Sequence, residues 1–286
     1  MADRNFDDLA PRFARNIYGS HKGRVRLEVL KRDLCDYVPL FQNLAGVEVL
    51  DMGAGQGHFS LGLAEQGAHV HLCDVSEKML AMAKVRWQEI CEAQAQAGMP
   101  TIGSATFTQC ALQQLPAKGY PLVLGHAVLE WLEDPRQGFG YLVDSVATGG
   151  YLSVIVYNAH GLAFKNLLRG NFKKFDRNNF KAFKGSLTPI SPLTPEQLMQ
   201  WGNELKLELV GFSGIRVFQD YILDKSIREA DPDGLLVKEL EYSRLEPYRN
   251  MARYLHFVFK RPRNECPLLI KRAIGCSLLD AGLSLV

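Results

Sequence analysis

The sequence predicts an α/β protein built on a doubly wound, mostly parallel sheet of seven strands. Apolar runs of strand length alternate with amphipathic helical segments between residues 47 and 157, which is the pattern of parallel strands joined by crossover helices. Two strand-like segments near the end of the chain, 206–218 and 252–260, are expected to close the sheet as an antiparallel pair. Helices precede the first strand, and a basic insert follows the fifth.

Composition places the chain among ordinary globular proteins. Of its 286 residues 47% are hydrophobic and 22% charged, which suits one large domain with a sizeable core. The formal net charge of +2 is nearly neutral, so contact with nucleic acid has to come from a local basic patch. The six cysteines include no C-x-x-C pair, and the N-terminus has no apolar signal segment. We therefore expect a reduced, cytoplasmic protein without membrane spans.

Two helices are expected before the first strand, at residues 4–18 and 24–37. Phe6, Leu9, Phe13 and Ile17 recur at helical spacing in the first of them. Residues 1–44 would form an N-terminal helical cap. This cap either closes over a site at the mouth of the sheet or covers one side of the sheet, and the sequence favours neither.

A glycine-rich loop follows the first strand. The apolar run 47–50 ends at Asp51, and Gly53, Gly55 and Gly57 come next, before a helix expected over residues 58–66. Glycine permits a sharp turn and a close approach of a ligand, and the turn directs free N–H groups of the helix outward. Alone, the loop is either a cofactor loop or a structural turn, because a lone glycine pattern is a weak signal.

The later elements follow from periodicity and capping signals. Strands are expected at 68–74, 105–110, 122–126 and 151–157, with helices at 76–96 and 138–146 between them. Ser76 is a suitable N-cap for the longer helix. A further helix begins at Thr194, where proline follows the cap and Gln197 occupies the capping-box position. Residues 235–244 form the last expected helix.

Acids and glycines should meet at one edge of this sheet. Ligands of open parallel sheets bind outside the carboxyl ends of the strands. Asp74 closes the second strand, where an acid can accept hydrogen bonds from ribose; it could instead cap the next helix, and the glycines upstream favour ribose. A nicotinamide dinucleotide and S-adenosylmethionine fit this much equally well. The spacing D-x-G-x-G-x-G and the segment 126–135 after the fourth strand, which resembles that of class I methyltransferases, favour a methyltransferase.

Six short segments in order carry a closer resemblance: 3–8, 15–19, 126–135, 157–162, 214–218 and 246–248. Together they resemble the bacterial tRNA 5-carboxymethoxyuridine methyltransferase family over about residues 1–262. The resemblance implies a Rossmann-like class I methyltransferase domain over 1–262 and leaves 263–286 as a tail. It also implies methyl transfer from S-adenosylmethionine to the carboxylate of 5-carboxymethoxyuridine at the tRNA wobble position, with S-adenosylhomocysteine as coproduct and no metal.

The same resemblance implies roles for the cofactor residues. Arg26 would pair with the methionine carboxylate, a geometry that suits guanidinium, and Asp74 would contact ribose. Gly53 and Ala54 would contact the methionine portion, Ala111 and Leu112 the adenine. The chain departs from the family at Gln113–Gln114, which replace an acid, so we expect altered adenine contact. The complete predicted set is Arg26, Asp51, Gly53, Ala54, Gly55, Asp74, Ala111, Leu112 and His126, the last beside the methionine half and the reaction centre.

Binding of the acceptor carboxylate requires other residues than binding of the cofactor. The carboxylate is already ionised at pH 7, so no general base is required. Cations or N–H donors must select it and hold it in line with the methyl group. The candidates are Arg216, Arg244, Tyr248, Tyr157 and His160.

The insert at 160–193 is the least ordinary segment. Between residues 164 and 184 it interleaves phenylalanines with lysines and arginines, and Asp176 is the only acid. Cations can neutralise phosphates and aromatic rings can stack on bases; the alternative is a solvated basic loop whose rings pack on the body. The candidate RNA contacts are Lys165, Arg169, Phe172, Lys173, Lys174, Arg177 and Lys181.

Two other functions share the cofactor residues. One is a small-molecule class I O-methyltransferase. The other is a non-catalytic S-adenosylmethionine-binding partner of a tRNA-modifying enzyme. The basic aromatic insert and the family-like segments argue against the first, and Arg26 with the His126 segment against the second.

Overall fold

The computed structural model describes residues 20–98, 103–114, 118–173 and 189–263. The helix expected over 4–18, the tail beyond Arg263, and the predicted RNA contacts Lys174, Arg177 and Lys181 lie outside the described residues.

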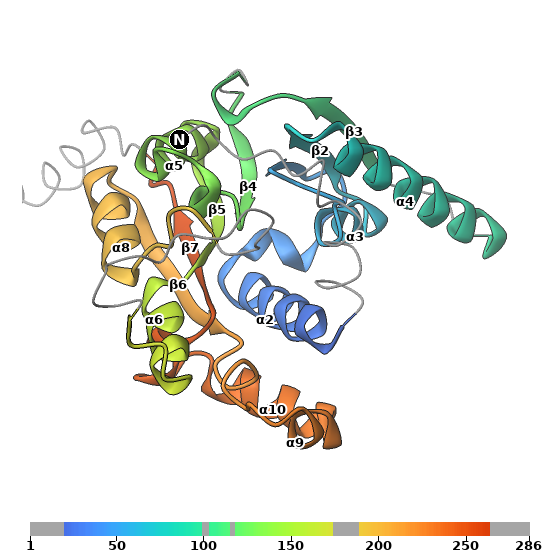
Figure 1. Ribbon diagram of the computed structural model, residues 1–286. Coiled ribbons are helices and arrows are strands. Elements are labelled where there is room, and N and C mark those ends of the chain that lie inside the picture. The colour runs from blue at the N-terminus through green and yellow to red at the C-terminus, as the bar shows by residue number, and fades with distance from the viewer. Residues whose placement is uncertain (1–19, 99–102, 115–117, 174–188, 264–286) are drawn as a thin grey trace, which may run out of the picture.

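A seven-stranded sheet in the order β3-β2-β1-β4-β5-β7-β6 forms the centre of the molecule (Figure 1). The first five strands pair in parallel, and β7 runs antiparallel to both of its neighbours. The predicted fold class is therefore confirmed, including the antiparallel closing pair. The strands are β1 (Glu48–Met52), β2 (His69–Asp74), β3 (Ser104–Gln109), β4 (Tyr120–His126), β5 (Val146–Tyr157), β6 (Glu208–Ile215) and β7 (Tyr254–Lys260).

The fifth strand is longer than predicted. It was expected at 151–157, but β5 already begins at Val146, which is paired with Tyr120. The Gly149 N–H donates to the carbonyl of Arg261, at 2.8 Å, and the N–H of Arg261 donates to the carbonyl of Gly150. These bonds keep the glycines inside the sheet at a register shift, so glycine here marks an irregular strand and not its start.

The helices lie close to their predicted positions. Ser76 accepts a hydrogen bond from the N–H of Met79, and Thr194 with Gln197 forms the expected capping box. The helix expected over 24–37 begins at His21, and the one expected over 138–146 spans Pro135–Asp144. The helices are α2 (His21–Tyr37), α3 (Ser60–Glu65), α4 (Glu77–Gln96), α5 (Pro135–Asp144), α6 (Ala159–Leu168), α8 (Pro195–Glu204), α9 (Lys225–Ala230), α10 (Pro232–Tyr242) and α11 (Tyr248–Met251), with short 3-10 turns η2 (Pro39–Gln42), η3 (Leu112–Gln114) and η4 (Leu129–Trp131).

Helices cover both faces of the sheet because strand side chains alternate between the faces. On one face, Leu61 of α3 and Leu80 of α4 pack with Leu72 and Leu122. On the other, α5 and α8 pack against β5, β6 and β7, and the Phe139 ring lies 5.7 Å from that of Phe259. Both sides of the sheet are therefore buried, as a doubly wound fold requires.

Helix α2 covers the end of the sheet formed by β5, β6 and β7. Val25 and Val29 pack with Ile155 and Ile215, and Leu34 packs with Val258. The described part of the predicted cap thus covers one side of the sheet. None of the described helices has the length and apolar character needed to span a membrane.

Two helical glycines give a matched test of this packing. A Cβ on Gly161 of α6 would lie 2.3 Å from the backbone oxygen of Ala252, whereas a Cβ on Gly140 of α5 would meet nothing within 4 Å. Gly161→Ala is expected to destabilise the protein by about 1–3 kcal/mol, since backbone cannot yield as a side chain does. Gly140→Ala is expected to stabilise it by up to about 1 kcal/mol through helix propensity. Urea unfolding measures both, and equal effects would contradict the packing described.

Candidate active site

The glycine loop between β1 and α3 is held by the end of β2. The N–H groups of Gly53 and Ala54 both donate to the carbonyl of Cys73, at 2.8 and 3.0 Å. Gly53 has φ +67°, and a Cβ there would lie 2.3 Å from a methyl carbon of Val128. Only glycine fits this backbone and this close approach, which explains the first glycine of the motif.

Asp74 joins this loop to the start of α4. One carboxylate oxygen accepts from the Gly55 N–H and the other from the Ser76 N–H, each at 2.8 Å. The N-cap of α4 is Ser76, so Asp74 is not the helix cap that was the alternative to ribose binding; it stabilises the turn before the cap. It also lines the pocket described next, so its contact with ribose stays a prediction.

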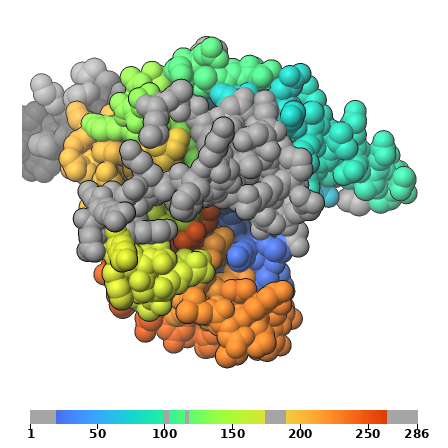
Figure 2. Space-filling view, viewed as in Figure 1, coloured from blue at the N-terminus to red at the C-terminus, as the bar shows by residue number. Residues whose placement is uncertain are grey.

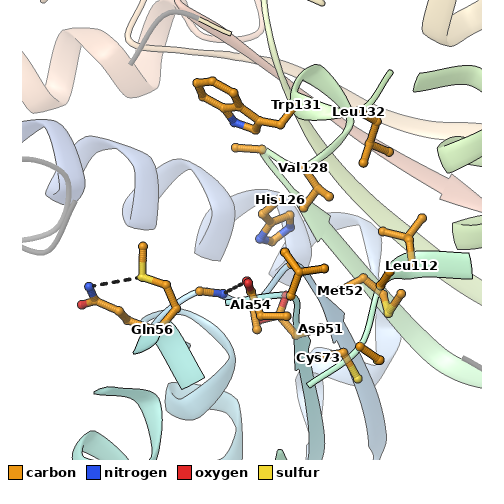
Figure 3. A pocket seen from close by; sticks show the side chains of 18 of the residues that line it. Asp51, Met52, Ala54, Gln56, Cys73, Leu112, His126, Val128, Trp131 and Leu132 are labelled. Atoms are coloured by element: carbon orange, nitrogen blue, oxygen red, sulfur yellow. Dashed lines mark hydrogen bonds between the residues drawn. The ribbon is translucent and has the colours of Figure 1, made fainter. Parts of the chain in front are cut away.

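One pocket at the carboxyl ends of β1, β2 and β4 is lined by all nine residues of the predicted cofactor set (Figure 3). Its wall runs from the glycine loop, past Leu112, to His126 at the end of β4 and Val128 just beyond it. Gln113 also lines it, while the Gln114 side chain accepts the Ala111 N–H at 2.9 Å. The structure thus brings the predicted residues together; their individual contacts with a cofactor stay predictions.

Arg26 reaches this pocket from α2. Its side chain is 7% exposed, and Nη2 is buried without a hydrogen-bond partner among the described residues. The guanidinium carbon lies 4.9 Å from the centre of the Tyr254 ring. A buried guanidinium N–H without an acceptor is costly, so this atom fits an anionic group such as a carboxylate.

Two buried acids lie at or near the pocket. Burial, with the nearby carboxylate of Asp74, raises the pKa of Asp51 to about 7. Burial likewise raises the pKa of Glu130 to about 7, against an opposing effect of Arg26. Both acids therefore change charge near neutral pH, and Asp51 does so in the pocket wall.

Several lining residues were missed by sequence reasoning. His58 and Phe59 directly follow the glycine loop, and Met79 lies in the first turn of α4 after Asp74. Their positions next to motif residues were the available signal. Trp131 and Leu132 line the pocket from the segment after His126, which was recognised only as a whole. Among the described residues, no group of three or more His, Cys, Asp or Glu side chains could hold a metal ion.

Two of the five predicted acceptor residues lie close to this pocket. Arg216, at the end of β6, and Arg26 both stack on the Tyr254 ring, with Arg216 5.4 Å from its centre. Tyr157 ends β5 and packs edge-on against the same ring, at 5.2 Å. The Tyr157 hydroxyl is buried and has no partner among the described residues.

The other three lie elsewhere. Arg244 donates to buried Asp33 at 2.7 Å and pairs with Asp36 at 2.8 Å. Tyr248 is 40% exposed and packs on the ring of Tyr242. His160 follows β5, with a side chain 43% exposed and 3.9 Å from a carboxylate oxygen of Glu196. None of the three lines the pocket, so their contact with an acceptor stays a prediction.

Four predicted RNA contacts are described. Arg169, Phe172 and Lys173 are exposed at and beyond the end of α6, and Phe172 is 60% exposed. Lys165 instead pairs with buried Asp220 at 3.1 Å, and its side chain is only 15% exposed. Lys165 is therefore mostly buried, whereas the other three are exposed.

Known proteins with this architecture define the class. A family model described as a methyltransferase domain matches residues 50–152. Magnesium protoporphyrin IX methyltransferase from Synechocystis PCC 6803 with bound S-adenosylhomocysteine superposes with a TM-score of 0.58, at 18% identity, over 90% of this chain and 96% of that chain. The fold is that of Rossmann-like methyltransferases, and the family model together with the first relative given below shows that the chain is an S-adenosylmethionine-dependent methyltransferase.

Sequence relatives narrow the class. The tRNA 5-carboxymethoxyuridine methyltransferase of Escherichia coli strain K12 is 37% identical over 268 residues, which are 93% of this chain and 99% of the relative. The chain belongs to this family. A ubiquinone biosynthesis O-methyltransferase from Azoarcus sp. strain BH72 is 25% identical over 63% of this chain and 72% of its own.

The predicted role of Arg26 can be tested against its neighbour on the same helix. Arg26→Ala is expected to weaken S-adenosylhomocysteine binding by about 1.5–3 kcal/mol, the contribution of a charge-assisted hydrogen bond. Arg24, whose side chain is 52% exposed and pairs with Asp233, is the matched control, and Arg24→Ala should leave the affinity unchanged. Isothermal titration calorimetry measures both; equal losses would remove Arg26 from the cofactor site.

Asp51 should make the choice between cofactor and coproduct depend on pH. S-adenosylmethionine carries a sulfonium charge that S-adenosylhomocysteine lacks, so an ionised Asp51 favours the former. With a pKa of about 7, Asp51 gains its charge between about pH 6 and about pH 8, and the preference for S-adenosylmethionine should rise over that interval. Binding measured at both pH values tests this. Asp51→Asn should abolish the rise; a rise that survives would point to another group, such as Glu130.

Proposed function

We propose that this protein transfers a methyl group from S-adenosylmethionine to the carboxylate of 5-carboxymethoxyuridine at the wobble position of tRNA, forming the methyl ester. Membership of the family supports 5-carboxymethoxyuridine as the acceptor. One structural observation supports an acceptor with a negative charge. Beside the cofactor pocket lies a basic cluster, defined here as Lys22, Arg26, Lys165, Arg216 and Arg253.

The basic cluster draws its members from four segments. Lys22 and Arg26 lie on α2, Lys165 on α6, Arg216 at the end of β6 and Arg253 just before β7. Figure 2 shows α2 in blue, α6 in yellow-green and the α9–α10 region in orange around a hollow on one face of the molecule. Because its cations come from four segments, an anionic group bound at the basic cluster would meet them from several directions.

Carboxylates within the protein neutralise only part of this charge. Asp220 pairs with Lys165 and Arg216. Burial alone would raise the pKa of Asp220, but these cations hold it well below its usual range. Lys22 and Arg253 form no ion pair with a described residue, and Arg253 lies over the Tyr157 ring, 4.4 Å from its centre. Burial lowers the pKa of Lys22, partly offset by Asp220. The cluster therefore has positive charge to spare.

The two other acids near the basic cluster, Glu239 and Glu130, do not neutralise its remaining positive charge. Glu239 accepts the backbone N–H groups of residues 217, 218 and 219, so its carboxylate serves the turn after β6. Glu130 has a pKa near 7 because it is buried, which leaves it partly neutral at physiological pH. Burial also raises the pKa of Tyr157, whose hydroxyl thus keeps its proton and can donate to an acceptor carboxylate.

The reaction mainly requires that the acceptor carboxylate be held in the correct orientation toward the methyl group. Bound S-adenosylmethionine supplies an electrophilic methyl group. A carboxylate is ionised at neutral pH, and its conversion to an ester releases no proton, so the protein needs no general base. The basic cluster would hold the carboxylate, and orientation of this kind contributes up to roughly 7–11 kcal/mol in favourable intramolecular reactions. Trp131 and Leu132 in the pocket wall would exclude water.

Exposed residues beyond α6 support a nucleic-acid acceptor. Arg169, Phe172 and Lys173 combine cations with an exposed aromatic ring next to the helix that carries Lys165. Stacking of a base on an aromatic ring contributes about 1–3 kcal/mol. The acceptor would then reach the basic cluster while its RNA contacts this neighbouring surface.

A transfer assay tests the proposal directly. The protein is incubated with methyl-labelled S-adenosylmethionine and tRNA carrying or lacking the carboxymethoxy group. Base-labile label only on the modified tRNA is expected. Label on small phenolic acceptors and not on tRNA would favour a small-molecule O-methyltransferase, and activity appearing only with an added enzyme would favour a cofactor-binding partner.

Within that assay, Arg253 is the most informative cation. Arg253→Gln is expected to lower kcat/KM for modified tRNA by about ten- to a hundredfold, as for a lost charge-assisted hydrogen bond, with S-adenosylhomocysteine affinity unchanged. Arg249, which stacks on Phe212 and pairs with Glu246, is the control, and Arg249→Gln should retain activity. Full activity of Arg253→Gln would exclude Arg253 from acceptor binding.

A further inference from the structure

A buried chain of polar side chains crosses the sheet beneath α2. Nε2 of His126 lies 2.8 Å from the Ser153 hydroxyl, which lies 2.9 Å from Nε2 of His256. Nδ1 of His256 lies 2.8 Å from a carboxylate oxygen of Asp33. We call these four residues the relay: Asp33, His256, Ser153 and His126. It connects α2 to the wall of the cofactor pocket, where His126 lies (Figure 3).

The strand register places the relay on one face. His126 of β4 pairs with Ile155 of β5, and Ile155 pairs in turn with His256 of β7. Ser153 lies two residues from Ile155 and so shares its face. Asp33 meets this row from α2, and Ser153, His256 and Asp33 are at most 1% exposed. A polar row in an otherwise apolar interface is costly unless all its members are hydrogen-bonded, and here each one is.

The direction of the hydrogen bonds follows from the chemistry of the groups. Burial alone would raise the pKa of Asp33, but hydrogen bonds from His256 and Arg32 hold it well below its usual range, so this carboxylate only accepts. Nδ1 of His256 must therefore carry a proton. The Ser153 hydroxyl has one proton and lies between two ring nitrogens, so it donates to one ring and accepts from the other.

Charge balance decides whether Ser153 donates its proton to His256 or to His126. Arg32 and Arg244 bring two positive charges to Asp33, and Asp33 together with Asp36 brings two negative ones. The group is thus neutral without His256, and an imidazolium there would be a buried, unbalanced charge. With His256 neutral, its Nε2 accepts from Ser153, and Ser153 must accept from an N–H at Nε2 of His126.

His126 is neutral as well. Its ring is buried and lies beside Arg26, and burial together with this guanidinium lowers its pKa well below the usual value. A neutral imidazole has a proton on one nitrogen only. With that proton on Nε2, Nδ1 has none, and Nδ1 has no hydrogen-bond partner among the described residues.

We infer that the relay from Asp33 fixes His126 as the tautomer protonated at Nε2 and thereby presents Nδ1 to the cofactor pocket as a hydrogen-bond acceptor. Ser153, His256 and Asp33 are then positioning residues that act through His126. The group that an acceptor nitrogen of this kind suits is a cationic N–H donor, and the ammonium of the methionine portion of S-adenosylmethionine is one. The relay would thus complement Arg26, which suits the carboxylate of the same portion.

Nitrogen NMR of the histidine rings tests the tautomer directly. In ¹⁵N-labelled protein at neutral pH, with His126 identified by its absence from a His126→Asn variant, the Nε2-protonated form is expected. Ser153→Ala removes the acceptor of that proton and should convert His126 to a mixture of tautomers. Ser213 is the matched control: it is fully buried on β6, paired with His256 across the strands and bonded to Arg32 at 3.2 Å, but it touches no ring nitrogen. Ser213→Ala should leave the His126 signals unchanged. An Nδ1-protonated wild type, or identical His126 signals in Ser153→Ala, would overturn the inference.

A binding measurement tests whether Nδ1 of His126 faces the amino-acid portion of the cofactor. Ser153→Ala is expected to weaken S-adenosylhomocysteine about three- to tenfold, the effect of one hydrogen bond. Binding of 5′-methylthioadenosine, which lacks the amino-acid portion, should stay unchanged. Equal losses for both ligands, or loss of neither, would contradict the assignment. Neither measurement needs tRNA, so the outcome is independent of the acceptor proposed above.

Discussion

The carboxylate of Asp33 is the interaction on which the arrangement of this molecule depends. It accepts hydrogen bonds from Arg32, from Arg244 and from His256 of the sheet, and so ties α2 to β7 and to the chain after α10. Removing one partner from such a buried group typically costs about 3–5 kcal/mol. Arg26 lies seven residues earlier, two helical turns along the same face. By fixing α2 on the sheet, Asp33 therefore also fixes where Arg26 enters the pocket.

Charge is distributed between two adjoining regions of opposite sign. Asp51 and Asp74 lie in the pocket wall and suit a cationic cofactor, whereas the basic cluster around Asp220 suits an anionic acceptor. Arg26 belongs to both regions, since it lines the pocket and shares the Tyr254 ring with Arg216. Opposite charges on the two reactants are what methyl transfer from a sulfonium to a carboxylate requires. With the charges separated in this way, the cofactor would be attracted to the acidic pocket wall and the acceptor to the basic cluster, so that the two reactants bind side by side.

The fold and the cofactor pocket could be predicted because their signals are local. Glycine spacing, an acid at a strand end and strand–helix alternation follow from backbone geometry over a few residues. Arg26, Ala111, Leu112 and His126 came instead from the family resemblance, and all nine predicted cofactor residues line one pocket. The start of β5 was missed for the same reason. Gly149 and Gly150 are local loop signals, but hydrogen bonds with Arg261, more than 100 residues away, keep them in the sheet.

Acceptor binding could not be assigned in this way, because the choice depends on which cations already have partners. Arg244 was among the predicted acceptor contacts, and Arg253 was not. Arg244 is bonded to Asp33, 211 residues away, and to Asp36 as well, whereas Arg253 has no ion-pair partner among the described residues and lies over Tyr157. A guanidinium with two carboxylate partners has little attraction left for a third, so Arg253 is the better candidate for the acceptor. Arg244 instead stabilises the outer end of the relay. Its effect on the reaction would come through Asp33 and His126, at the cofactor and not at the acceptor.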